Sequence, residues 1–262
     1  MPELPEVQSF KAYFDRSALQ QKIVETVVHD AKIIRNQDAF NFSELTRGRS
    51  FVGSYRRGKY LFPEMDNGHH LLLHFGMTGD LNYYQDSEDQ SKHERFVFHF
   101  ENGYKLGFDC PRKFARILYL EDRDAYIQKI RLGEDILEMD ESTFLAIADG
   151  KKSSLKGFLL NQKLLSGVGN LYADEVCYQT QIHPASVVKA IPKAQLQLIF
   201  QKLQDILQYA IQKGAYYKDY PPDWLWEWRA KGYKAPDGSE IASAKIGGRT
   251  TYYFDTWQTL YQ

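Results

Sequence analysis

The sequence predicts an α+β fold, in which a β-rich first half begins with one helix and a helical second half ends in a β-hairpin. Short alternating apolar segments recur at a spacing of about ten residues before residue 122. Beyond residue 139 the apolar residues recur at helical spacing. A glycine pair near the C-terminus separates two further β-like segments. The two halves are therefore expected to fold as different domains.

In the first half, one helix follows Pro5, where Val7, Phe10 and Phe14 begin an apolar face. The turn composition of Asp66-Asn67-Gly68 and of 101–103 predicts hairpins. Short strands with such turns between them indicate an antiparallel sandwich or barrel. Strands are predicted at 23–28, 32–35, 50–55, 60–62, 70–74, 95–100 and 104–108.

The polar stretch 122–139 is predicted to be a linker, with residues 1–121 before it. After it, Asp140 can cap a helix that runs through Ala148 and stops at Gly150. Residues 140–232 are expected to form a helical domain and residues 233–262 a β-hairpin around Gly247-Gly248. The remaining helices are predicted at 155–162, 171–180 and 193–213, and the strands of the tail at 241–246 and 250–257.

Composition excludes several classes of protein. No apolar run approaches the ~20 residues of a membrane helix, and the N-terminus carries acids where a signal peptide carries bases. A cytoplasmic protein is therefore expected. Two distant cysteines, Cys110 and Cys177, cannot build a disulfide framework or a four-cysteine zinc site, and both are interpreted as buried. The net charge of −1 gives no sign of nucleic-acid binding, so any such surface must be local.

The chain opens Met1-Pro2-Glu3, a segment that could supply a nucleophile and a proton-transfer group. Removal of the initiator methionine would leave a secondary amine with a pKa near ~8, so a sizeable fraction is unprotonated at neutral pH. Attack of this amine on a carbon electrophile gives a charged iminium that favours elimination, and Glu3 could move protons beside it. The alternative is an acidic helix N-terminus that complements the helix dipole.

Three further stretches suit phosphate or DNA. Arg56-Arg57-Gly58-Lys59 is either a phosphate clamp or a solvated hairpin edge. Met77 and Phe114 either wedge into a base stack or pack in the core, and Arg112 could enter the vacated space. Asn170 follows Gly167-Val168-Gly169 and is predicted to cap a helix whose first amides bind phosphate. A bland connection between two helices explains the glycines equally well.

Taken together, these stretches resemble the formamidopyrimidine-DNA glycosylase and endonuclease VIII (Fpg/Nei) family. The segments PELPE, RRGKYL, HFGMTG, DCPRKF and LLNQKLLSGVGNLYADEV occur in the family order and span nearly the whole chain. The resemblance implies an N-terminal catalytic antiparallel β-sandwich with a leading helix. It also implies a helical helix-two-turn-helix (H2TH) DNA-binding domain that ends in a β-hairpin finger.

The resemblance also implies roles for single residues. Pro2 matches the nucleophile, Glu3 the proton shuttle and Lys59 the essential lysine near the reacting sugar. His74 and Asn170 match phosphate ligands. Glu175 lies where the motif borders the lesion pocket. The residues that fill the gap left by the flipped base are matched by Met77, Arg112 and Phe114, a trio closer to the Fpg branch.

The C-terminus departs from the pattern of most bacterial relatives, which end in a four-cysteine zinc finger. Phe254 and Trp257 stand where the last two cysteines would be, so no metal is expected and the hairpin resembles the zincless finger of some relatives. Packing of Phe254, Trp257 and Tyr253 is predicted to replace the cross-link of the metal. Arg249 matches the finger arginine that grips phosphates around the lesion.

The implied activity is that of a bifunctional DNA glycosylase and AP lyase, which acts without a cofactor in base excision repair. Oxidised purines in duplex DNA, such as 8-oxoguanine and formamidopyrimidine, are the expected substrates, and abasic sites are cut. The segment 214–232 is shorter than the Fpg capping loop and rich in Trp and Tyr. Oxidised pyrimidines therefore remain an alternative class of substrate. A monomer near the bacterial nucleoid is expected. The rivals are a non-catalytic damage-binding protein and a small-metabolite enzyme such as a tautomerase.

Overall fold

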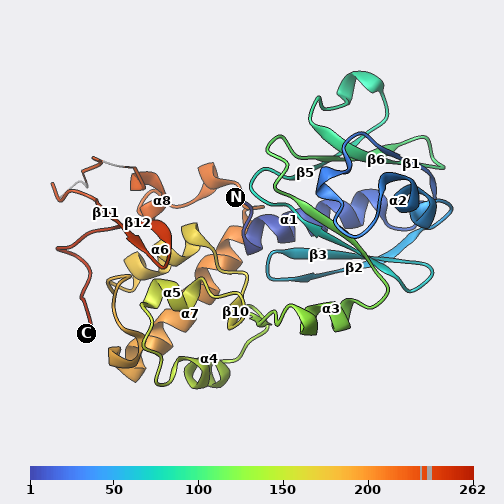
Figure 1. Ribbon diagram of the computed structural model, residues 1–262. Coiled ribbons are helices and arrows are strands. Elements are labelled where there is room, and N and C mark those ends of the chain that lie inside the picture. Colours follow the sequence, from blue (N-terminus) through green and yellow to red (C-terminus); the bar gives the residue numbers. More distant parts are fainter. Residues whose placement is uncertain (231, 235–237) are drawn as a thin grey trace. The chain divides into compact units, whose positions relative to one another are not determined.

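The computed structural model describes residues 1–230, 232–234 and 238–262, and the chain forms two compact units, Met1–Arg131 and Leu132–Gln262 (Figure 1). The boundary falls inside the stretch 122–139 that was predicted as a linker. Residues 231 and 235–237, which belong to the predicted helical domain and finger, lie outside the described residues.

The first unit is an antiparallel β-sandwich with a leading helix, as the sequence predicted. Its two four-stranded sheets have the orders β1-β6-β7-β5 and β2-β3-β4-β8. Helix α1 (Leu4–Ala18) contacts β2, β3 and β5, so it packs on strands of both sheets. The strands are β1 (Ile23–Val28), β2 (Phe51–Arg57), β3 (Tyr60–Met65), β4 (His70–His74), β5 (Asp80–Tyr84), β6 (Glu94–Phe100), β7 (Lys105–Asp109) and β8 (Arg116–Leu120).

Apolar side chains from both sheets and from α1 form one buried core, which includes Phe14, Phe51, Leu71, Phe98 and Phe108. The core residues that come from strands, such as Phe96, Phe98 and Phe100 of β6, lie on alternate positions, because successive residues of a strand face opposite sides of the sheet. Burial of this core holds the two sheets together and fixes the loops at their ends.

The strand predicted at 32–35 is wrong. The segment forms a short 3₁₀ turn, η1 (Ala31–Ile33), because the Asp30 carboxylate accepts the Lys32 N–H at 3.0 Å and caps it. Strands β5 and β8 and helix α2 (Ala39–Thr46) were not predicted. The other short elements of the first unit are η2 (Ser87–Asp89) and α3 (Arg123–Lys129).

The second unit is helical and ends in a β-hairpin, which agrees with the predicted H2TH domain. In α4 (Glu141–Ala148) the Asp140 carboxylate caps the first turn, as predicted. The central helix α6 contacts α7, α8 and β12. The other helices are α5 (Leu155–Leu159), α6 (Asn170–Gln179), η3 (Val188–Ala190), α7 (Lys193–Gln212), η4 (Tyr217–Asp219) and α8 (Leu225–Trp228).

The strands of the second unit form two small sheets. A parallel pair joins β9 (Glu134–Asp135) to β10 (Leu165–Ser166), and an antiparallel hairpin joins β11 (Ala242–Ile246) to β12 (Arg249–Tyr253). Gly247 and Gly248 form the turn with φ angles of +59° and +77°, the left-handed region that favours glycine. Within the described parts of the chain, no helix has the length and apolar character that crossing a membrane requires.

Candidate active site and nucleic-acid interface

The N-terminus is fixed by the first turn of α1. Glu3 is the N-cap residue, only 3% exposed, and its N–H donates to the Glu6 carboxylate at 2.8 Å. This capping geometry holds the chain that leads into the helix. Pro2 is half-buried directly before the cap, while Met1 is exposed. The sequence therefore places Pro2 and Glu3 at a rigid helix start rather than on a free tail.

Lys59 lies in the tight turn between β2 and β3. Gly58 adopts φ +56° there, which favours glycine. The buried Arg56 donates to the Gly58 carbonyl at 3.1 Å and to the Gln8 side chain of α1 at 2.7 Å. Arg56 thus fastens the turn to helix α1, which Pro2 precedes, and it is not a solvated phosphate ligand. The idea that all three bases form a phosphate clamp is corrected for Arg56.

His74 ends β4, and its ring centre lies 5.0 Å from that of Tyr60 in β3. Burial, then the nearby Arg116 and Lys59, lower the pKa of His74 to about 4. The Gly76 N–H donates to Nδ1 at 3.2 Å. The imidazole is therefore neutral, with its proton on Nε2, and can donate one hydrogen bond there.

Two loops of the first unit meet and bring the predicted gap-filling residues together. A side chain at Gly76 has no room, because a Cβ built there would lie 2.5 Å from the Phe114 carbonyl carbon. The Arg112 N–H donates to the Thr78 hydroxyl at 3.3 Å, and the Arg112 guanidinium lies 5.2 Å from the Phe114 ring centre. Met77 and Phe114 are 39% and 53% exposed, which excludes the core-packing alternative for both.

The loop that carries Arg112 and Phe114 is stabilised by Asp30 and Arg95. Lys113 adopts φ +57°, and its Nζ lies 2.5 Å from the Asp30 carboxylate. The Lys113 hydrogen bond is the main reason why the pKa of Asp30 is lowered. Arg95 donates to the carbonyls of Cys110 and Pro111 at 2.8 and 3.3 Å. Sequence reasoning missed this support, because Asp30 and Arg95 are distant in the chain.

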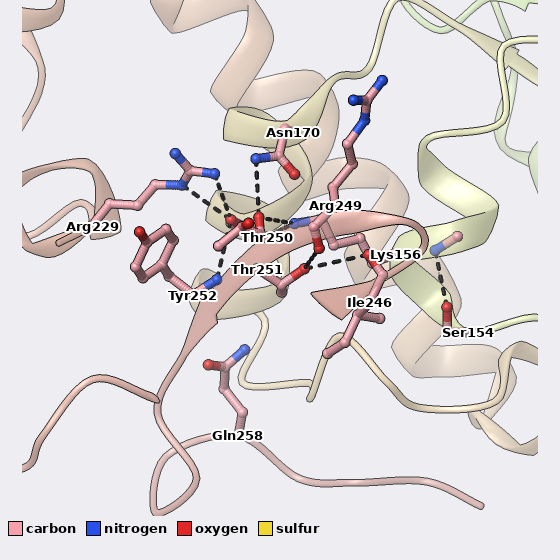
Figure 2. A network of polar contacts seen from close by, with 12 residues as sticks. Ser154, Lys156, Asn170, Arg229, Ile246, Arg249, Thr250, Thr251, Tyr252 and Gln258 are labelled. Atoms are coloured by element: carbon pink, nitrogen blue, oxygen red, sulfur yellow. Dashed lines mark hydrogen bonds and ion pairs between the residues drawn. The ribbon is translucent and has the colours of Figure 1, made fainter. Parts of the chain in front are cut away.

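In the second unit, Asn170 and Arg249 come together at the hairpin (Figure 2). Asn170 is the first residue of α6, with Gly169 as the N-cap, so the prediction that Asn170 caps the helix is wrong. Its Nδ2 donates to the Thr250 carbonyl at 3.1 Å, and its buried Oδ1 has no hydrogen-bond partner in the described part of the chain. Arg249 is exposed directly before Thr250, and Figure 2 shows its side chain extending away from the hairpin.

A buried ion network fastens the same hairpin. The Lys156 ammonium pairs with Asp174, and both side chains are fully buried. Asp174 also accepts the Arg229 Nε–H at 3.0 Å and the Tyr252 N–H of β12 at 3.4 Å. Lys156 reaches the Thr250 carbonyl at 3.5 Å. Sequence reasoning missed this network, although an acid inside the LYADEV segment of α6 was a possible signal.

Glu175, on the next position of α6, holds the aromatic segment that follows α7. It is 2% exposed and accepts the N–H groups of Leu225 and Trp226, each at 3.3 Å, and the Gln179 amide at 2.9 Å. Burial raises the pKa of Glu175 to about 7 despite these donors. The carboxylate therefore fixes the start of α8.

The finger hairpin is packed differently from the prediction. Phe254 is buried with Leu225 and Ile241, as expected for a residue that replaces a zinc ligand. Trp257 stays 48% exposed, and Tyr253 packs on His183 with ring centres 4.4 Å apart. Phe254 and Trp257 each pack on the Tyr178 ring of α6, with ring centres 6.0 and 6.3 Å apart, so the aromatic packing of the finger runs through Tyr178. Among the described residues, no group of three His, Cys, Asp or Glu side chains could hold a metal ion.

Known proteins share this architecture. The family model "Formamidopyrimidine-DNA glycosylase N-terminal domain" matches residues 1–117, and "Formamidopyrimidine-DNA glycosylase H2TH domain" matches residues 132–219. A formamidopyrimidine-DNA glycosylase of Arabidopsis thaliana is 30% identical over 100% of this chain and 72% of its own length. That of Pelotomaculum thermopropionicum is 30% identical over 98% of this chain and 99% of its own.

A solved structure agrees with this likeness. Lactococcus lactis Fpg (MutM), bound non-covalently to DNA that contains an AP site, superposes with a TM-score of 0.88 at 25% identity. The match covers 98% of this chain and 100% of that one. The chain belongs to the formamidopyrimidine-DNA glycosylase and endonuclease VIII family.

Proposed function

We propose that the protein is a bifunctional DNA glycosylase and AP lyase that removes oxidised purines from duplex DNA as a monomer. The observation that carries the proposal is the capped N-terminus, where Pro2 and Glu3 stand at a rigid helix start, with the turn of Lys59 fastened to the same helix through Arg56 and Gln8. The relatives named formamidopyrimidine-DNA glycosylase support the substrate class.

Pro2 is the proposed nucleophile, and removal of Met1 frees its nitrogen. The amine attacks C1′ of the damaged nucleotide, a new N–C1′ bond forms, and the bond from C1′ to the base breaks. The base leaves with a proton, and the closed sugar ring remains bound to the Pro2 nitrogen through C1′. Glu3 delivers a proton to O4′, the C1′–O4′ bond breaks, and the opened sugar is left on the protein as an iminium.

Strand cleavage follows from the iminium charge. That charge acidifies the C2′ hydrogen, so loss of this proton breaks the C3′–O bond, which is the β-elimination. Loss of a second proton from C4′ breaks the C5′–O bond, which is the δ-elimination. Both DNA ends then carry phosphate, and water releases the sugar remnant from Pro2. Lys59 is proposed to neutralise a phosphate beside the reacting sugar.

The DNA is proposed to be held by phosphate contacts from His74, Asn170 and Arg249. Met77, Arg112 and Phe114 would enter the base stack at the place that the damaged base leaves. The exposure of Met77 and Phe114 and the contact between their two loops support this role. Glu175 is proposed to act on the lesion indirectly, because it fixes the segment that starts at Leu225.

Oxidised pyrimidines remain the second candidate substrate. The segment that would cover the flipped base is stiffened by aromatic contacts, with Tyr217 and Trp226 ring centres 4.4 Å apart. The Tyr220 hydroxyl also lies 2.7 Å from that of Tyr172 in α6. A stiff aromatic cover accepts a base by shape and stacking, so its preference can differ from that of a mobile loop.

Borohydride trapping tests the proposal. The protein is incubated with duplexes that contain 8-oxoguanine, thymine glycol or an abasic site, and the reduced adduct is mapped by mass spectrometry. A Pro2 adduct with 8-oxoguanine and abasic DNA is expected. An adduct with thymine glycol but not 8-oxoguanine would move the substrate to pyrimidines.

The matched variant is Pro2→Gly, which is expected to lose most strand cleavage while it still binds abasic DNA. If none of the three duplexes gave an adduct with the unaltered protein, the enzyme proposal would fail and a damage-binding protein would take its place.

A further inference from the structure

A surface pocket of about 270 Å³ lies in the second unit, away from the proposed phosphate ligands. Its lining residues are Tyr178, Gln179, Asp223, Trp224 and Trp257. Three of them are aromatic, and the carboxylate of Asp223 is the only charged group among them. Asp223 and Trp224 belong to the segment proposed to cover the flipped base, but none of the single-residue roles proposed for base excision falls on a lining residue.

The aromatic walls are held in place from behind. Trp224 is 8% exposed, and its ring centre lies 5.4 Å from that of Tyr209 and 5.0 Å from that of Tyr220. The Trp257 indole N–H donates to the Tyr178 carbonyl at 3.3 Å. Because these rings are already ordered, a ligand does not have to order them when it binds.

The pocket also has a negative charge balance. Asp223 is exposed at its rim. Trp257 is 48% exposed although it is a large apolar side chain. A half-exposed indole beside a carboxylate is the combination that attracts cations, through the negative face of the ring and through direct charge.

We propose that this pocket binds a small organic cation, one whose ammonium group sits between the Trp224, Trp257 and Tyr178 rings and against Asp223. DNA is the wrong ligand, because the carboxylate repels phosphate. The pocket is also remote from Asn170, which begins α6, whereas Tyr178 lies about 12 Å further along the same helix. The proposal does not depend on the glycosylase function, because cation binding is measured without DNA.

Nuclear magnetic resonance of the indole N–H groups tests the proposal with three probes. Choline and butylammonium carry the charge, and 3,3-dimethylbutan-1-ol is the neutral isostere of choline. We expect saturable shifts of the Trp224 and Trp257 signals with at least one cation, at an affinity about fivefold or more above that of the neutral isostere. Equal binding of the isostere, or no saturable shift with either cation, would overturn the proposal.

Variants separate the pocket from general charge effects. Asp223→Asn is expected to weaken cation binding about fivefold. Trp257→Ala should weaken binding further, since it removes a wall. Glu227→Gln is the matched control, because Glu227 is an exposed acid outside the pocket. Equal loss in Glu227→Gln and Asp223→Asn would mean that the cation responds only to the overall charge, and the pocket would be rejected.

Discussion

Because the imidazole of His74 is neutral, this proposed phosphate ligand would act as a hydrogen-bond donor and not as a cation. The Gly76 N–H occupies Nδ1, so Nε2 is left as a donor whatever the pH near neutrality. A neutral donor stabilises a phosphate less than a cation does, but it needs no proton uptake when DNA binds. The positive charge at this place comes instead from Lys59 and Arg116, which also keep His74 neutral.

Nuclear magnetic resonance should find His74 uncharged in the free protein between about pH 5.5 and pH 8, with its proton on Nε2. The reason is the lowered pKa of His74, about 4, caused first by burial. Nitrogen shifts of the imidazole report both charge and tautomer. A titration with a midpoint near the ordinary value of ~6.5 would show that burial at this position is weaker than the fold implies.

Glu175 should make the stability of the protein depend on pH. Burial raises the pKa of Glu175 from 4.5 to about 7, so the folded state binds more protons than the unfolded state between these values. The contribution is fully present below pH 4.5 and is lost as the pH rises through 7. A shift of this size corresponds to about 3 kcal/mol.

Urea unfolding of the protein and of Glu175→Gln at about pH 5 and about pH 8 isolates this contribution. The stability lost between the two pH values should be smaller in the variant by about 2.5 kcal/mol, since a small part of the contribution is already lost at about pH 5. Other groups titrate in both proteins and cancel in the difference. Equal pH dependence in the two proteins would mean that Glu175 ionises normally.

At the scale of elements, the loop 109–114 depends on charges that lie outside it. Lys113 takes a left-handed backbone conformation that costs free energy, and its pairing with Asp30 offsets that cost. Arg95 binds two carbonyls of the loop and lies 3.7 Å from the same Asp30. Asp30 is therefore a positioning residue for Arg112 and Phe114.

Asp30→Asn is expected to slow release of an oxidised base about tenfold, because the side chains proposed to fill the gap lose their fixed place. Cleavage of an abasic duplex should fall much less, since no base has to be flipped. Single-turnover rates of the variant and of the unaltered protein are measured on both duplexes, and the fall in rate on one duplex is compared with the fall on the other. Asp86→Asn, at an exposed position without a capping hydrogen bond, is the control. An equal fall on both duplexes would indicate general destabilisation instead.

Local patterns predicted those elements whose signals are local. Hairpin turns at Asp66-Asn67-Gly68 and the Asp140 cap lie where composition placed them. Helix α2 has eight residues, too few to show a clear period, and its Asp38 cap was not recognised as the Asp140 cap of α4 was. The roles of Arg56 and Lys156 also escaped, since their partners Gln8 and Asp174 are brought close only by the fold.

At the scale of the whole molecule, a net charge of −1 has to coexist with binding to a polyanion. Each unit contributes proposed phosphate ligands of its own, Lys59 and His74 from the first and Asn170 and Arg249 from the second. Affinity then depends on a few local contacts rather than on a general positive field. Modest affinity with a steep salt dependence follows, since each neutralised phosphate releases counterions.

Titration of an abasic duplex at several salt concentrations tests this distribution of charge. The logarithm of the binding constant should fall linearly with the logarithm of the salt concentration, and Arg249→Ala should make the slope shallower by about 0.9. Arg47→Ala is the control, because Arg47 is 56% exposed beside Glu44. A flat response of the unaltered protein would reject phosphate contacts altogether. If the unaltered protein gave the expected slope but Arg249→Ala did not change it, Arg249 would not contact phosphate. The proposed phosphate contacts would then be those of Lys59, His74 and Asn170.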